Sequence, residues 1–160
     1  MIQRIQTLFL LLSSVCMILF LFFPVWLKID PATGEFYKVY STYLAHQVNA
    51  DPTVKLTFLP YAYGGGIAVL TVLISWIEIF QFKNRLTQIK LGALNSLLMT
   101  GSLVLMVYLT YKAQSNILPN ILGEYKVGLF MPAAALIWNS IANRFIRKDE
   151  KLVRSVNRIR

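Results

Sequence analysis

The chain contains very few of the residues on which disulfides, metal centres and acid–base catalysis depend. It has one cysteine, one histidine and seven acidic residues among 160. Cys16 therefore cannot form an internal disulfide, and His46 has no cysteine or second histidine with which to build a metal site. The apolar stretches hold no pair of carboxylates, and we find no Ser/His/Asp set. The sequence thus predicts no enzyme activity and no cofactor.

Charged residues are also scarce. They make up 14% of the chain and hydrophobic residues 56%, whereas soluble domains are about 25% charged. Residues 5–27, 56–77, 91–111 and 127–143 carry no charge at all. Because a helix needs about 20 mostly apolar residues to cross the hydrocarbon core of a bilayer, the sequence predicts an integral membrane protein.

These apolar stretches predict an all-α membrane protein, a four-transmembrane-helix bundle that forms a single integral membrane domain over residues 1–160. The expected spans are residues 6–27, 58–82, 91–112 and 127–146. The fourth reaches span length only by including Arg144, because an arginine near a helix end can extend its charge to the interface.

Residues 28–57 form the expected outer loop between the first two spans. The runs "VWLKI" and "EFYKVY" are rich in β-branched and aromatic residues, and they flank the turn residues "DPATG". This pattern predicts a β-hairpin at the start of the loop. We expect the loop to be a small cap over the helices.

Lysine and arginine are distributed unequally between the two ends of the expected spans. Eleven lie beside the two termini and the 83–90 loop, and five lie on the other side. Cytoplasmic segments carry the excess of positive charge, so we expect a bacterial inner-membrane protein with both termini, including the tail 147–160, in the cytoplasm. Contact with the anionic lipids of the inner leaflet then accounts for the net charge of +9 without a nucleic-acid partner.

Four polar residues fall at a similar depth in the cytoplasmic half of the spans: Glu78, Asn95, Asn143 and Arg144. One interpretation is an interhelical polar clamp, in which Arg144 or the asparagines compensate the charge of Glu78. The other is a proton or ion relay. We favour the clamp, because a relay across the membrane would need acidic groups at the midplane and in the outer half, where the sequence has none.

Small residues occur at four-residue intervals in the third expected span. Gly92, Ser96 and Thr100 would share one face of a helix. Such a face allows a neighbouring backbone to approach closely. We therefore expect a tight helix contact along it.

The tail "KLVRSVNRIR" is predicted to be a basic amphipathic helix. Its apolar residues recur on one face and its basic residues on the others, and the predicted contact residues are Leu152, Val153, Arg154, Val156, Arg158 and Ile159. The simplest partner is the surface of the inner leaflet. A groove on a partner protein is the alternative, and ribosomal RNA is a third.

Three segments resemble a known family. They are the opening "MIQRIQ", the loop "FKNRLTQIKL" and the closing "NRFIRKDEKLVRSVNRIR". In these the chain resembles an uncharacterised family, a domain of unknown function, of short four-span inner-membrane proteins of Bacteroidota. The resemblance covers the whole chain. It implies an integral membrane protein with no assigned activity, cofactor or catalytic residue.

Two classes of function follow from the sequence. The first is a non-enzymatic accessory or scaffold subunit that joins a membrane-protein partner in a larger inner-membrane assembly. The second is a small oligomeric transporter or channel. The lack of charge at the midplane and the small number of spans argue against the second class.

Overall fold

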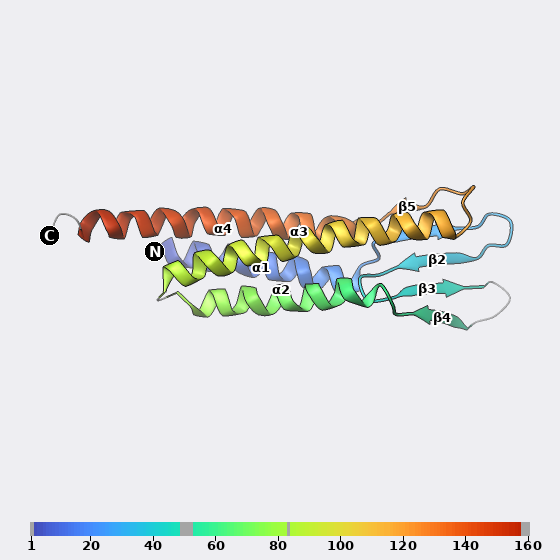
Figure 1. Ribbon diagram of the computed structural model, residues 1–160, viewed down its shortest axis with the longest axis horizontal. Coiled ribbons are helices and arrows are strands. Elements are labelled where there is room, and N and C mark those ends of the chain that lie inside the picture. The colour runs from blue at the N-terminus through green and yellow to red at the C-terminus, as the bar shows by residue number, and fades with distance from the viewer. Residues whose placement is uncertain (1, 49–52, 83, 158–160) are drawn as a thin grey trace.

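The computed structural model describes residues 2–48, 53–82 and 84–157. Its helices lie side by side, and a β-sheet is attached at one end (Figure 1). The helices are α1 (Ile2–Phe22), α2 (Ala62–Phe80), α3 (Arg85–Asn116) and α4 (Val127–Asn157). The strands are β1 (Trp26–Ile29), β2 (Phe36–Val39), β3 (Leu44–Gln47), β4 (Val54–Thr57) and β5 (Glu124–Tyr125).

The sheet shows that the prediction of an all-α fold is wrong. It is antiparallel and five-stranded, in the order β4-β3-β2-β1-β5. The expected hairpin is present as β1 and β2, with Trp26 opposite Val39. The other strands were missed, because strands of two to four residues carry a weak sequence pattern and depend on cross-strand partners for their stability.

The prediction of four spans is also wrong. Among the described residues, three helices are long and apolar enough to cross a membrane: Ile5–Phe22, Ala62–Phe80 and Arg85–Asn116. Helix α4 has the length but not the composition, because Asn139, Asn143 and Arg144 interrupt its apolar stretch.

Several helix boundaries differ from the expected ones. Helix α1 ends at Phe22 because Pro24 cannot donate a backbone hydrogen bond and disfavours the helical conformation of the residue before it. The chain then enters β1, so the expected first span, residues 6–27, ended five residues beyond the end of the helix. Helix α4 continues unbroken to Asn157, and the expected tail helix is therefore its last part.

The helices form a closed ring of neighbours in which α1 packs against α2 and α4, and α3 packs against the same two. The free ends of α1 and α4 lie at the end of the molecule opposite the sheet (Figure 1). At that end α4 extends beyond the other three helices.

One hydrophobic core joins the helices to the sheet. Helix α3 has 32 residues and is therefore about 48 Å long, well above the roughly 30 Å of a hydrocarbon core. Its last third extends alongside the strands (Figure 1), where Leu109 and Ala113 share a core with Trp26 and Val39. The sheet is thus packed on a helix that projects from the rest of the helical part.

Candidate functional site

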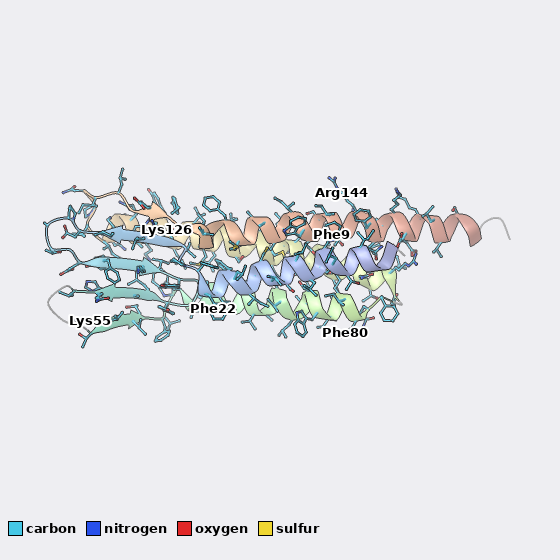
Figure 2. The ribbon with its side chains drawn as sticks, turned by 180° about the vertical axis from the view of Figure 1, so that it is seen from behind. Phe9, Phe22, Lys55, Phe80, Lys126 and Arg144 are labelled. Atoms are coloured by element: carbon cyan, nitrogen blue, oxygen red, sulfur yellow. The ribbon has the colours of Figure 1, made fainter. Side chains whose placement is uncertain are left out.

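Three of the four residues predicted to form a polar clamp are buried between the helices. Glu78 and Asn95 are 0% exposed and Asn143 is 8% exposed. Arg144 is exposed, and Figure 2 shows it pointing away from the helices. Among the described residues no ion pair joins Arg144 to Glu78.

The buried amides connect α2, α3 and α4. The Asn95 amide donates to Ser75 Oγ of α2 at 2.7 Å. The Asn139 amide of α4 donates to the Gly92 carbonyl at 2.9 Å and to Ser96 Oγ at 2.8 Å. These bonds have the geometry of an interhelical clamp. Asn139 was missed in the sequence, although it lies one turn before Asn143 in the same apolar run and could have been found by that spacing.

The Glu78 carboxylate takes no part in these bonds. Gln88 of α3 donates to the backbone carbonyl of Glu78 at 3.1 Å. Within the described part of the chain, neither carboxylate oxygen of Glu78 has a hydrogen-bond partner. Of the two charged residues of the predicted clamp, Arg144 is exposed, whereas Glu78 is buried with no partner for its carboxylate among the described residues.

A groove opens on the surface between α3 and α4 beside Asn143. It has a volume of about 280 Å³ and is lined by Ala93, Ser96, Ser140, Asn143, Arg144 and Arg147. Asn143 belongs both to this groove and to the buried interior, because its amide group lies against Gly92. The groove thus leads from the surface to the layer that contains the buried amides.

The contact between α1 and α4 combines polar and aromatic pairs. Gln6 donates to Asp149 Oδ2 at 2.6 Å. The Phe9 ring stacks on Trp138 and on Phe145, with a centroid distance of 5.7 Å in both pairs. Asp149, the other buried acid of the helical part, is therefore hydrogen-bonded, unlike Glu78.

The predicted tail contact is described only in part. Leu152 and Val153 are about half exposed, at 51% and 44%. Arg154 and Val156 lie within α4, and Arg158 and Ile159 lie outside the described residues. The contact of the tail with lipid or protein stays a prediction.

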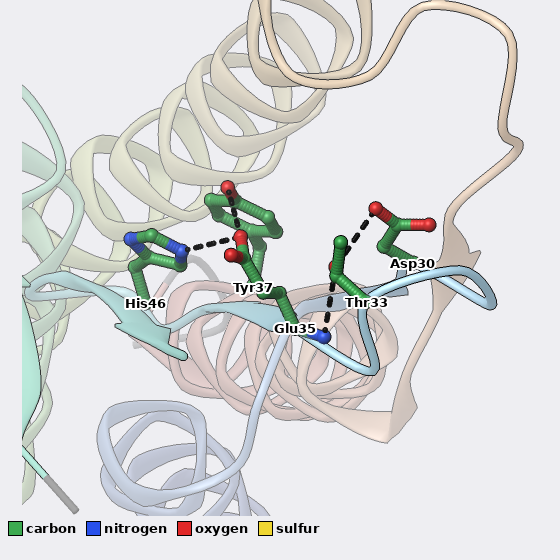
Figure 3. Close-up of polar contacts among 5 residues, drawn as sticks. All are labelled: Asp30, Thr33, Glu35, Tyr37 and His46. Carbon is green, nitrogen blue, oxygen red and sulfur yellow. Dashed lines mark hydrogen bonds and ion pairs between the residues drawn. The ribbon is translucent and has the colours of Figure 1, made fainter. Parts of the chain in front are cut away.

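A second polar cluster lies on the sheet. Tyr37 donates its hydroxyl to Glu35 Oε2 at 3.2 Å, and His46 Nε2 lies 3.1 Å from the same oxygen (Figure 3). The Tyr37 and His46 rings stack with centroids 4.2 Å apart. Burial raises the pKa of the Tyr37 hydroxyl, and its bond to Glu35 adds to the effect. The cluster thus joins β2 and β3 across one face of the sheet.

Asp30 shapes the turn between β1 and β2. Its carboxylate accepts a hydrogen bond from the backbone N–H of Ala32 at 2.9 Å. It also accepts one from the Thr33 hydroxyl at 2.9 Å (Figure 3). These bonds favour the ionised form and hold the pKa of Asp30 below its usual range. The turn residues predicted from the sequence are therefore fixed by a charged side chain.

Lys28 links the sheet to α3. Its side chain is 1% exposed, and its amino group donates to the Ile117 carbonyl at 2.5 Å and to the Gln114 carbonyl at 3.5 Å. Burial lowers the pKa of this amino group. Because the last carbonyls of a helix have no partner within it and carry negative partial charge, Lys28 caps the end of α3.

The family comparison matches residues 2–159 to the family described as "Domain of unknown function (DUF4293)". The chain belongs to this family. The match confirms the resemblance to an uncharacterised family over nearly the whole chain. The comparison with curated proteins gives no match.

In this DUF4293 chain, β4 forms one edge of the sheet. All four of its residues are exposed, including Val54 at 44% and Leu56 at 50%. An edge strand has backbone N–H and C=O groups that no neighbouring strand satisfies. This edge is open to a further strand.

Proposed function

We propose that the chain is a non-enzymatic integral membrane protein, an accessory or scaffold subunit of a larger inner-membrane assembly. The observation that supports this role is a sheet that shares a core with α3 and whose edge strand β4 exposes Val54 and Leu56. A partner can add an extended segment to such an edge, where backbone hydrogen bonds provide affinity and side chains such as Val54 and Leu56 provide selectivity.

The attachment of the sheet to the helices is close at several points. The Gly65 N–H donates to the Ser41 carbonyl at 2.6 Å, and the Gly128 N–H donates to the Pro24 carbonyl at 3.0 Å. Gly123 lies so close to the Trp26 indole that a Cβ atom there would collide with it. A partner bound to the sheet would therefore be held at a defined position relative to the helices.

The proposed location is the inner membrane of a bacterium of the Bacteroidota, with both termini in the cytoplasm and the sheet outside. Helices α1, α2 and α3 are the apolar candidate spans, and α4, which packs along α1 and α3, would run beside them through the same layer and return the chain to the cytoplasmic side. Two observations support this orientation: the uneven distribution of lysine and arginine, and the position of both helix ends opposite the sheet (Figure 1). Arg144, Arg147 and the tail would then meet the anionic inner leaflet. The buried clamp of Asn95 and Asn139 would hold the helices together at that depth.

The test combines purification with site-specific crosslinking. A photoreactive residue replaces Leu56 on the edge strand, and the matched control carries it at Ala32, which is also exposed but lies in the β1–β2 turn. After irradiation of native membranes, the tagged chain is purified in mild detergent. We expect one crosslinked companion in stoichiometric amount from position 56 and none from position 32. Equal crosslinking at both positions, or none at either, would refute the proposal.

The second candidate is a small oligomeric transporter or channel. The unpaired carboxylate of Glu78 favours it, because intramembrane ionisable groups commonly mark ion pathways. No other acidic residue lies within the three candidate spans. This candidate predicts an oligomer of the chain alone and ion flux in proteoliposomes, whereas the first predicts a heteromeric assembly.

A further inference from the structure

The interior between α2, α3 and α4 contains more hydrogen-bond acceptors than donors. Five buried acceptor oxygens have no partner within the described residues: both carboxylate oxygens of Glu78 and the amide oxygens of Asn95, Asn139 and Asn143. In the described helices, one guanidinium nitrogen of Arg85 is the only side-chain donor that is buried without a hydrogen-bond partner. Buried polar groups in proteins are nearly always paired. This group of oxygens therefore needs positive charge or donated protons.

The residues that carry these oxygens either belong to α3 or contact it between Gln88 and Ser96. The Gln88 amide reaches the backbone of Glu78, and Asn95 reaches α2 one turn before Glu78. Because the Cα–Cβ bond of a helical residue is tilted toward the N-terminus of its helix, the Glu78 side chain is directed from the Gln88 contact toward the Ser75–Asn95 contact. From the other side, the Asn143 amide of α4 occupies the space that a side chain at Gly92 would need. Glu78 from α2 and Asn143 from α4 are thus both placed beside the stretch of α3 between Gln88 and Asn95.

The charge of Glu78 decides what can bind there. A carboxylate that is ionised, fully buried and unpaired costs several kcal/mol. No ion pair among the described residues compensates it. On the helices that pack around α2 and α3, Arg144 and Arg147 are exposed, Arg85 forms no ion pair within the described part of the chain, and the acid Asp149 is bonded to Gln6. Helix α1 contributes the neutral Leu10 to the interior. A cation at Glu78 would neutralise the carboxylate and use the unpaired amide oxygens.

We propose that Glu78, together with the amide oxygens of Asn95 and Asn143, binds one small monovalent cation, which is a proton or a sodium ion. A bound proton makes Glu78 a donor to an amide oxygen, and a bound sodium ion takes the same oxygens as ligands. Exchange with solvent passes through the groove beside Asn143, whose lining includes Ser140 and Arg147. This inference is independent of the proposed docking at the sheet.

The probe is N,N′-dicyclohexylcarbodiimide, which reacts with protonated carboxyl groups in apolar surroundings. The acid adds across one N=C bond of the reagent: its proton goes to nitrogen and its oxygen to carbon. The product rearranges to a stable N-acylurea, and no group leaves. The full-length chain in detergent is treated at about pH 6 and about pH 9, with sodium chloride or choline chloride, and the adduct is measured by intact-mass spectrometry.

We expect one adduct on the wild-type chain and none on Glu78→Gln. The matched control is Asp149→Asn, which removes the other buried acid of the helical part and should leave the adduct unchanged. If the cation is a proton, labelling falls about tenfold per pH unit above the point at which Glu78 ionises and does not depend on sodium. If it is sodium, sodium chloride protects Glu78 and choline chloride does not.

Thermal unfolding gives a second readout that does not depend on access of the reagent. An unpaired buried carboxylate destabilises the folded chain once it is ionised. The wild-type Tm should therefore fall as the pH rises or as sodium is replaced by choline, and Glu78→Gln should remove that dependence. A Tm that responds identically in the two chains, together with no adduct that depends on Glu78, would overturn the proposal. That result would leave the scaffold role untouched, because crosslinking at the sheet edge tests it separately.

Discussion

The contact between α3 and α4 at Gly92 gives the sharpest prediction about stability. A Cβ atom at Gly92 would lie 2.5 Å from Nδ2 and 2.7 Å from Cγ of Asn143. Both distances are well below van der Waals contact, and Asn143 is itself buried. The substitution Gly92→Ala must therefore displace the whole Asn143 amide.

The matched control is Gly101→Ala in the same helix. A Cβ atom at Gly101 would meet nothing within 4 Å. Alanine favours a helix interior over glycine by about 1 kcal/mol, and this gain is common to both variants. Overpacking of a filled interior costs about 1–3 kcal/mol. We therefore expect Gly92→Ala to be less stable than Gly101→Ala by about 1–3 kcal/mol.

The free energy of unfolding is measured by adding dodecyl sulfate to the chain in mild detergent and following helix loss by circular dichroism. Shortening Asn143 to alanine should make room for the Cβ atom at position 92. Adding Asn143→Ala to Gly92→Ala should therefore recover part of the lost free energy of unfolding. Equal stability of the two single variants would show that α4 does not approach α3 at Gly92, and the clamp geometry would then be wrong.

Three further predictions concern orientation, pH and the tail. In a Cys16→Ser background, an impermeant thiol reagent should label Thr33→Cys in intact spheroplasts and Ser155→Cys only after permeabilisation; the reverse pattern would refute the orientation. The pKa of Asp30 lies below its ordinary value of 3.8, so its stabilisation of the turn is present above that pH and is lost as the pH falls through the lower, folded-state pKa. Amide exchange in the turn should then accelerate, and Asp30→Asn should show no such pH step. Deletion of residues 150–160 should preserve membrane insertion and weaken binding to anionic vesicles; unchanged binding would reduce the tail to an orientation signal.

The candidate site could be predicted from the sequence only in part. The equal depth of polar residues in neighbouring apolar stretches pointed to Glu78, Asn95 and Asn143, each of which is buried in the structure. Spacing did not reveal that Arg144 points outward, because neighbouring residues of a helix face directions about 100° apart. The role of Asn139 depends on the Gly92 carbonyl of another helix, and no pattern local to either segment contains that contact.

The sequence by itself determined the long apolar helices, since hydrophobic periodicity and length are local properties of the chain. It also determined the β1–β2 hairpin, because turn residues flanked by strand-forming residues act locally. Only the tertiary structure decided that the segments between the helices complete a sheet, since β5 has two residues and exists through its pairing with the distant β1. It also decided that, among the described residues, none pairs with the Glu78 carboxylate, because any compensating side chain for a buried charge has to come from a neighbouring helix.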